Sequence, residues 1–162
     1  MKKTLDDFNF KGQKALVRVD FNVPLEEGKI TDDARIVAAL DTIKYILDDG
    51  GSLILLSHLG RPKGQAKKEF SLEPVAKRLE ELLERRVDFV QSDLVVDDGV
   101  KEKLATMEEG EVVLLENTRY RKEEEANDEG FAKDLASLGD IYINDAFGTA
   151  HRAHAVSYTH LR

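Results

Sequence analysis

The sequence predicts an α/β fold: a three-layer α/β/α domain with a parallel, Rossmann-like sheet. The first observation is a set of five short apolar runs, at Ala15–Val19, Leu53–Leu56, Val87–Val90, Val112–Leu115 and Ile141–Ile143. Several of them are apolar throughout, which is typical of strands buried on both faces. The second observation is that longer stretches separate the runs, and most of these have helix periodicity. Strands joined by helices form right-handed crossovers and therefore a parallel sheet with helices on both faces.

Four of the intervening stretches carry the apolar spacing and the end signals of helices. The first runs from Thr31, with a stripe of Ile and Leu at helical spacing, and closes at Gly50-Gly51. The second runs from Ser71, which can cap it, with Pro74 in the first turn, where proline is tolerated. The other two cover Val100–Met107 and the segment between Asp128 and Gly139.

Composition narrows the class of protein. The chain has 162 residues, a formal net charge of −8 and no cysteine. Its length suits a single domain, and its charge argues against nucleic-acid or membrane-surface binding. The absence of cysteine excludes disulfides and thiolate metal sites. No signal peptide or membrane-length apolar run is present. We therefore expect a cytoplasmic, monomeric protein with no nucleic-acid or membrane partner.

Polar and basic residues gather where the predicted strands end. Ligands of open parallel sheets bind outside the carboxyl ends of the strands. Four of the five runs are followed there by an arginine, and three of the four histidines lie there too. The residues concerned are Asp20, Asn22, Arg35, His58, Arg61, Arg119, His151, Arg152 and His154. Converging arginines repel one another unless an anion is bound, so this edge predicts a site for a small, multiply anionic metabolite.

Each of these residues also has a purely structural interpretation. Arg35 could pair with Asp32 or Asp33, and Arg18, inside a strand, is expected to form a structural ion pair. Asp20 and Asn22 could be turn-formers, and Arg61 and Arg119 could be solvated loop residues. Convergence at one edge favours the functional interpretation.

No nucleotide motif is present. The chain contains neither Gly-x-x-x-x-Gly-Lys-Ser/Thr nor Gly-x-Gly-x-x-Gly. A nucleotide would therefore have to bind elsewhere.

Four motifs, in order, resemble those of phosphoglycerate kinases. They are Val17–Pro24, Ser57–Pro62, Leu114–Tyr120 and Asn144–Arg152. The resemblance implies a glycolytic and gluconeogenic kinase that transfers a phosphoryl group reversibly between 1,3-bisphosphoglycerate and ADP, giving 3-phosphoglycerate and ATP. It further implies two α/β domains around a cleft, of which this chain would be the amino-terminal, substrate-binding one.

The same resemblance assigns roles to the residues at the edge. Asp20 and Asn22 would hold the glycerate end of the substrate. The phosphate would be held by His58, Arg61, Arg119 and Arg152. Arg35 would be the catalytic residue that neutralises the phosphoryl group in transfer. ATP or ADP with Mg²⁺ would be bound by the second domain, so no cofactor-binding or metal-binding residue is assigned here.

The resemblance divides the chain in two. Residues 1–155 correspond to the amino-terminal domain of the family. Residues 156–162 show no helix or strand periodicity and are interpreted as a non-native tail on a truncated sequence, inactive as a kinase by itself.

Two other functions stay open at this point. The first is a non-catalytic module that binds a phosphorylated acid. The second is a metal-dependent hydrolase using His58, His151 and His154, although no further ligand has convincing spacing.

Overall fold

A sheet of six strands, five of them parallel to one another, forms the centre of the described part of the chain. The computed structural model describes residues 5–126, 128–145 and 154–157. The strand order is β5-β6-β4-β1-β7-β8. The bounds are β1 Lys14–Val19, β4 Ser52–Leu56, β5 Asp88–Val90, β6 Val112–Leu115, β7 Ile141–Asp145 and β8 His154–Ser157. All pairs except β7 with β8 are parallel, as the five apolar runs predict.

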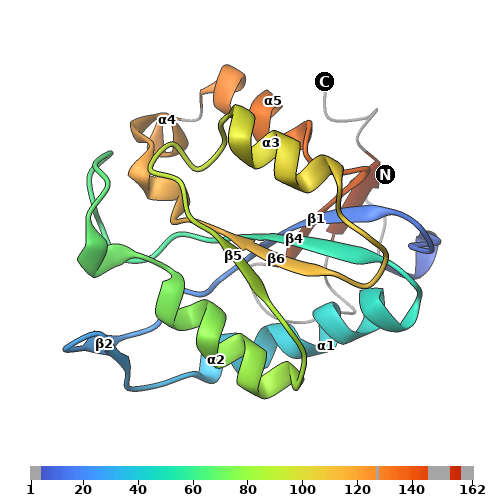
Figure 1. Cartoon of the computed structure of the whole chain (residues 1–162), viewed down its shortest axis with the longest axis horizontal. Coiled ribbons are helices and arrows are strands. Elements are labelled where there is room, and N and C mark those ends of the chain that lie inside the picture. The colour runs from blue at the N-terminus through green and yellow to red at the C-terminus, as the bar shows by residue number, and fades with distance from the viewer. Residues whose placement is uncertain (1–4, 127, 146–153, 158–162) are drawn as a thin grey trace.

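Helices cover both faces of the sheet, so the predicted three layers are confirmed (Figure 1). One face carries α1 (Ala34–Asp48) and α2 (Glu73–Leu83). The other carries α3 (Asp98–Ala105), the short α4 (Lys122–Glu125) and α5 (Glu129–Ala136). Single 3₁₀ turns lie at η1 (Leu5–Asp7), η2 (Lys68–Phe70) and η3 (Thr118–Tyr120). Among the described residues, no helix combines the length and the apolar character needed to cross a bilayer.

The apolar runs divide their side chains between two cores. In β4, Leu53 and Leu55 pack beneath α1 and α2, whereas Ile54 and Leu56 pack beneath α3 and α5. All five residues of this strand are buried. Each fully buried Leu or Ile contributes about 1.5–3 kcal/mol to folding, which is why the run can be apolar throughout.

Asp128 caps α5 as the sequence indicates, whereas the N-cap of α2 is Leu72 and the predicted cap, Ser71, lies one residue before it. Ser71 Oγ accepts a hydrogen bond from the backbone N–H of Glu73 at 3.2 Å. Asp128 Oδ1 accepts one from Phe131 N at 2.9 Å. Both bonds satisfy N–H groups that a helix leaves without an internal partner.

Two segments differ from the sequence-based expectation. The loop Phe21–Ile30 contains a small hairpin, β2 (Leu25–Glu26) with β3 (Lys29–Ile30). Its turn residues Glu27 and Gly28 have φ of 51° and 77°, values that two-residue hairpins of type I′ require.

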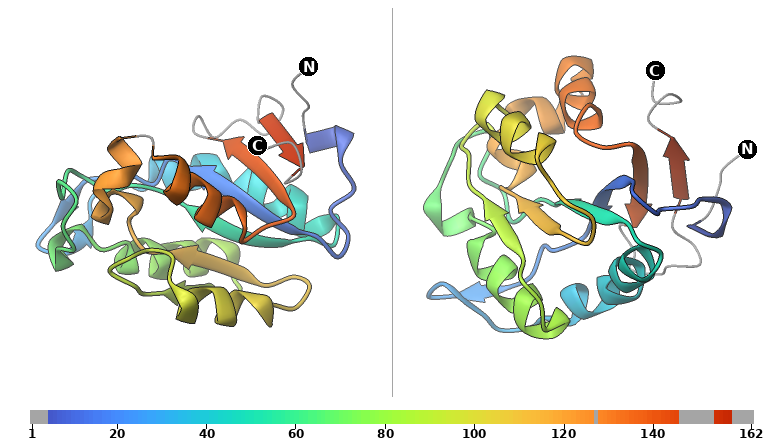
Figure 2. Two further views of the ribbon diagram at one scale, coloured as in Figure 1. Left: turned by 90° about the horizontal axis from the view of Figure 1, so that it is seen from above. Right: turned by 45° about the vertical axis from the view of Figure 1, so that its right-hand side comes forward.

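The second difference is at the carboxyl end. Val156 and Ser157, expected to follow no strand periodicity, lie in β8, which runs antiparallel to β7 (Figure 2). Ladder bonds to β7 can form a strand without a regular apolar pattern.

Candidate functional site

Three adjacent strands deliver the polar residues to one edge of the sheet. In the order β6-β4-β1, the central strand β4 has β6 on one side and β1 on the other. Asp20 and Asn22 follow β1, His58 follows β4, and Arg119 follows β6 within η3. Because the three strands are parallel, their carboxyl ends meet, and the segments after them bond to one another.

Asp20, Asn22 and Arg35 form one group. Nη1 of Arg35 donates to the carbonyl oxygen of Asn22 at 2.8 Å and to Asp20 Oδ1 at 3.3 Å. Asp20 Oδ1 also accepts from the backbone N–H of Asn22 at 3.1 Å. Arg35 pairs with Asp20 and not with Asp32 or Asp33, the neighbours that the structural interpretation favoured.

Two nitrogens of the Arg35 guanidinium have no hydrogen-bond partner among the described residues. Its side chain is 53% exposed, and its bonds to described residues all use Nη1. Nε and Nη2, the other two nitrogens of the planar fork, are thus available to an anion.

The second group is the loop that follows β4. Gly60 donates its backbone N–H to Asn22 Oδ1 at 2.8 Å, which joins this loop to the segment after β1. Gly60 has a φ of +61°, and a Cβ there would lie 2.6 Å from the ring of Phe70. Only glycine allows this backbone conformation and this close contact.

Asn117 holds both ends of the same loop. Its side chain is fully buried. Nδ2 donates to the carbonyl oxygens of Leu59 at 2.7 Å and Phe70 at 2.9 Å. Oδ1 accepts from the backbone N–H groups of Leu59 at 3.2 Å and Arg119 at 3.0 Å. One amide side chain thus fixes the loop after β4 against the segment that carries Arg119.

His58 is half-buried and belongs to the loop after β4. Burial, and after it the positive charge of Arg119, lowers the pKa of His58, while the negative charge of Asp20 acts in the opposite direction. Arg119 also donates from Nη1 to the carbonyl oxygen of Gly60 at 3.5 Å. The lowered pKa favours the neutral imidazole, which can donate one hydrogen bond to a ligand.

No bond between described residues joins a further predicted site residue to these groups. Arg61 is exposed, and no described residue bonds to its guanidinium. Arg152 and His151 lie outside the described residues, as does the side chain of His154. Arg18 forms the structural ion pair expected of it, with Glu124 at 2.5 Å, and its Nε also donates to the Tyr142 hydroxyl at 3.2 Å.

Sequence reasoning missed the residues that support the site. Ser57 Oγ accepts from Phe21 N at 2.9 Å and donates to the carbonyl of His58. The buried Glu116 accepts from Ser71 Oγ at 2.8 Å and from Leu72 N at 2.9 Å. The available signal was a run of polar residues directly after buried strands, since a buried polar side chain must find partners.

The described residues contain no cluster of His, Asp and Glu able to hold a metal ion. The site instead offers hydrogen-bond donors and positive charge. Fold and edge together define an α/β domain of the class that binds small ligands at the carboxyl ends of parallel strands.

The chain belongs to the phosphoglycerate kinase family. The sequence model of that family matches residues 5–161. The phosphoglycerate kinase of Clostridium novyi (strain NT) is 61% identical over 153 residues, which are 94% of this chain and 38% of that protein. That of Clostridium botulinum (strain Loch Maree) is 56% identical over 161 residues, 98% of this chain and 40% of its own length.

Solved structures agree with these relatives. The phosphoglycerate kinase of Coxiella burnetii superposes with a TM-score of 0.79 at 39% identity, over 95% of this chain and 38% of that one. That of Pyrococcus horikoshii gives 0.79 at 34% identity, over 93% of this chain and 38% of its own. The chain thus spans about 38–40% of the length of these relatives.

Proposed function

We propose that this chain is the substrate-binding domain of an enzyme that transfers a phosphoryl group reversibly between 1,3-bisphosphoglycerate and ADP. The observation that carries the proposal is the convergence of Asp20, Asn22, Arg35, His58 and Arg119 at the ends of three adjacent strands, in a chain of this family. Arg61 and Arg152 complete the proposed set. The nucleotide, with Mg²⁺, binds to the part of the enzyme outside this chain, and the enzyme acts as a cytoplasmic monomer.

The chemistry requires charge and position, not proton transfer. In the direction of ATP synthesis, the bond between phosphorus and the C1 carboxylate oxygen breaks while a bond to the terminal oxygen of ADP forms. The leaving group is a carboxylate and needs no proton. Arg119, with Arg61 and Arg152, holds the phosphate that stays on C3. Arg35 offers its free nitrogens to the transferring group, where negative charge is spread over three oxygens. Closure over the edge excludes the water that would otherwise accept the phosphoryl group.

The test is a full-length enzyme that carries this domain. It is built by joining residues 1–155 to the remaining part of the Clostridium novyi relative, and is called the full-length enzyme below. We expect it to synthesise ATP from 1,3-bisphosphoglycerate and ADP in a coupled assay, and we expect the isolated chain to be inactive. Turnover by the isolated chain contradicts the division of roles. A full-length enzyme that binds 3-phosphoglycerate but never turns over favours the non-catalytic binding module.

The depressed pKa of His58 predicts a proton linkage. A phosphate placed beside the imidazole favours its charged form, so the pKa rises on binding from a value below about 6.5. We therefore expect 3-phosphoglycerate binding to take up protons through His58, most strongly between the lowered pKa of the free enzyme and the higher pKa of the complex. The measurement is calorimetry of the full-length enzyme in two buffers that differ in ionisation enthalpy. The same measurement on His58→Gln serves as the control, because the ligand's own phosphate titrates equally in both experiments. Equal proton uptake by the two proteins would assign the linkage to another group.

A further inference from the structure

The residue that begins α1 uses its side chain in an unusual way. Asp33 occupies the N-cap position, where an Asp side chain ordinarily accepts a backbone N–H of the first turn. Here it makes no such bond, and the N–H of Ala34 is accepted instead by Asp32 Oδ1 at 2.9 Å. The carboxylate of Asp33 is directed towards α2.

Its partner is Arg78. Nε and Nη2 of Arg78 lie 2.9 Å and 2.8 Å from Asp33 Oδ2, and Nη1 lies 3.0 Å from Glu81 Oε2. All three guanidinium nitrogens are therefore engaged. Charge-assisted contacts through a planar fork fix orientation as well as distance.

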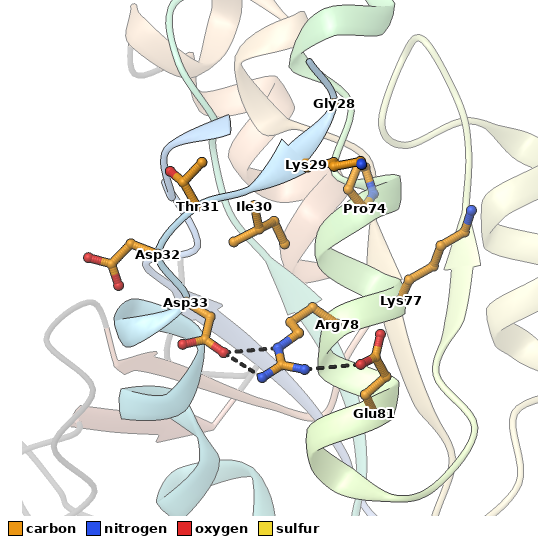
Figure 3. A pocket seen from close by; sticks show the side chains of 10 residues that line it. All are labelled: Gly28, Lys29, Ile30, Thr31, Asp32, Asp33, Pro74, Lys77, Arg78 and Glu81. Carbon is orange, nitrogen blue, oxygen red and sulfur yellow. Dashed lines mark hydrogen bonds and ion pairs between the residues drawn. The ribbon is translucent and has the colours of Figure 1, made fainter. Parts of the chain in front are cut away.

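This ion pair crosses a cavity of about 600 Å³ (Figure 3). Residues 28–33 line one side, and Pro74, Lys77, Arg78 and Glu81 of α2 line the other. Residues 31–35 are exposed or half-buried, and the first buried residue of α1 is Ile36. Close packing thus fixes α1 from Ile36 onwards, and the contact from Arg78 acts on the turn before it.

Arg35 emerges from that same turn. The carbonyl oxygen of Asp33 accepts the N–H groups of Ile36 at 2.9 Å and Val37 at 3.0 Å, so the position of Asp33 sets the path of the backbone through Arg35. We propose that Arg78 is a positioning residue: its contact with Asp33 holds the first turn of α1 so that the fork of Arg35 meets the transferring group. This inference rests on the proposed function.

A structural role and a positioning role predict different results. An ion pair as accessible to solvent as this one, with side chains 38% and 31% exposed, contributes little to stability, so a structural role predicts near-normal turnover without it. Misplacing a group that contacts the reaction lowers the rate even when the protein stays folded. In the full-length enzyme, we expect Arg78→Met to lower kcat about tenfold while KM for 3-phosphoglycerate changes less than about twofold.

The matched control is Lys77→Met on the same helix. Lys77 points away from Asp33, and its own partner, Glu73, is one turn away on α2 at 3.7 Å (Figure 3). We expect its kcat to be unchanged. Should Arg78→Met fold poorly, Asp33→Ala removes the acceptor of the same contact and should give the same loss.

A double-substitution cycle gives the decisive result. If Arg78 acts through Arg35, then Arg78→Met should cause no further loss of kcat in an Arg35→Ala background. An equal loss in both backgrounds, or no loss with Arg35 present, overturns the inference while leaving the proposed function intact. A normal kcat for Arg35→Ala itself refutes the proposed role of Arg35 and this inference together.

Discussion

Replacing Arg35 with Ala should lower the turnover number of the full-length enzyme about a thousandfold, or on the order of 4 kcal/mol. Arg35 is held through Nη1, bonded to the carbonyl of Asn22 and to Asp20, and no described residue bonds to its other two nitrogens. In the proposed function these nitrogens meet the charge that develops during transfer, so removing Arg35 should act on kcat more than on KM. Steady-state kinetics with 3-phosphoglycerate and ATP give both constants.

Two further substitutions separate this role from simple binding. Arg119→Ala should chiefly raise KM for 3-phosphoglycerate, because a residue on the phosphate that stays in place contributes equally to ground and transition states. Arg35→Lys should recover little activity, since a point charge does not reproduce the fork. If Arg35→Ala instead keeps its kcat and only weakens substrate binding, Arg35 is one more residue of the phosphate clamp.

The fold could be predicted because burial leaves a direct trace in the sequence. Leu53–Leu56 is apolar throughout, and in the structure it is buried on both faces of the sheet. The same reasoning placed the candidate residues at one edge, since carboxyl ends of parallel strands meet there whatever the strand order. The strand order itself depends on how the helices pack on the two faces of the sheet, and no local pattern encodes it.

The contacts within the site could not be predicted in this way. Proximity in sequence offered Asp32 and Asp33 as alternative partners for Arg35, yet its partner Asp20 is 15 residues away. Asp33 instead pairs with Arg78, 45 residues away on α2. The hairpin within Phe21–Ile30 was missed because Glu27, a non-glycine residue, adopts a positive φ there. These ion-pair partners and this backbone conformation are determined by tertiary packing, not by spacing in the sequence.

Asn117 shows most clearly that spacing does not reveal these contacts. It follows a strand, as a turn residue would, but its side chain bonds to Leu59 and Phe70, which are 58 and 47 positions away in the sequence. We expect Asn117→Ala to destabilise the domain by about 4 kcal/mol or more, the largest stability effect of any single polar substitution at this edge. Its removal leaves the N–H of Leu59 and the carbonyls of Leu59 and Phe70 without a partner, at about 1–3 kcal/mol for each buried group.

Urea denaturation of the chain measures this loss of stability, and two further variants serve as comparisons. Asn9 is an exposed asparagine whose Oδ1 accepts from the backbone N–H of Lys11 at 3.1 Å, so Asn9→Ala should change the free energy of unfolding by less than about 0.5 kcal/mol. Asn117→Asp keeps the acceptor but faces two carbonyl oxygens with a carboxylate, and should be about as damaging as Asn117→Ala. A loss below about 1 kcal/mol for Asn117→Ala would mean that water replaces the amide and that the loop after β4 is held by its other contacts.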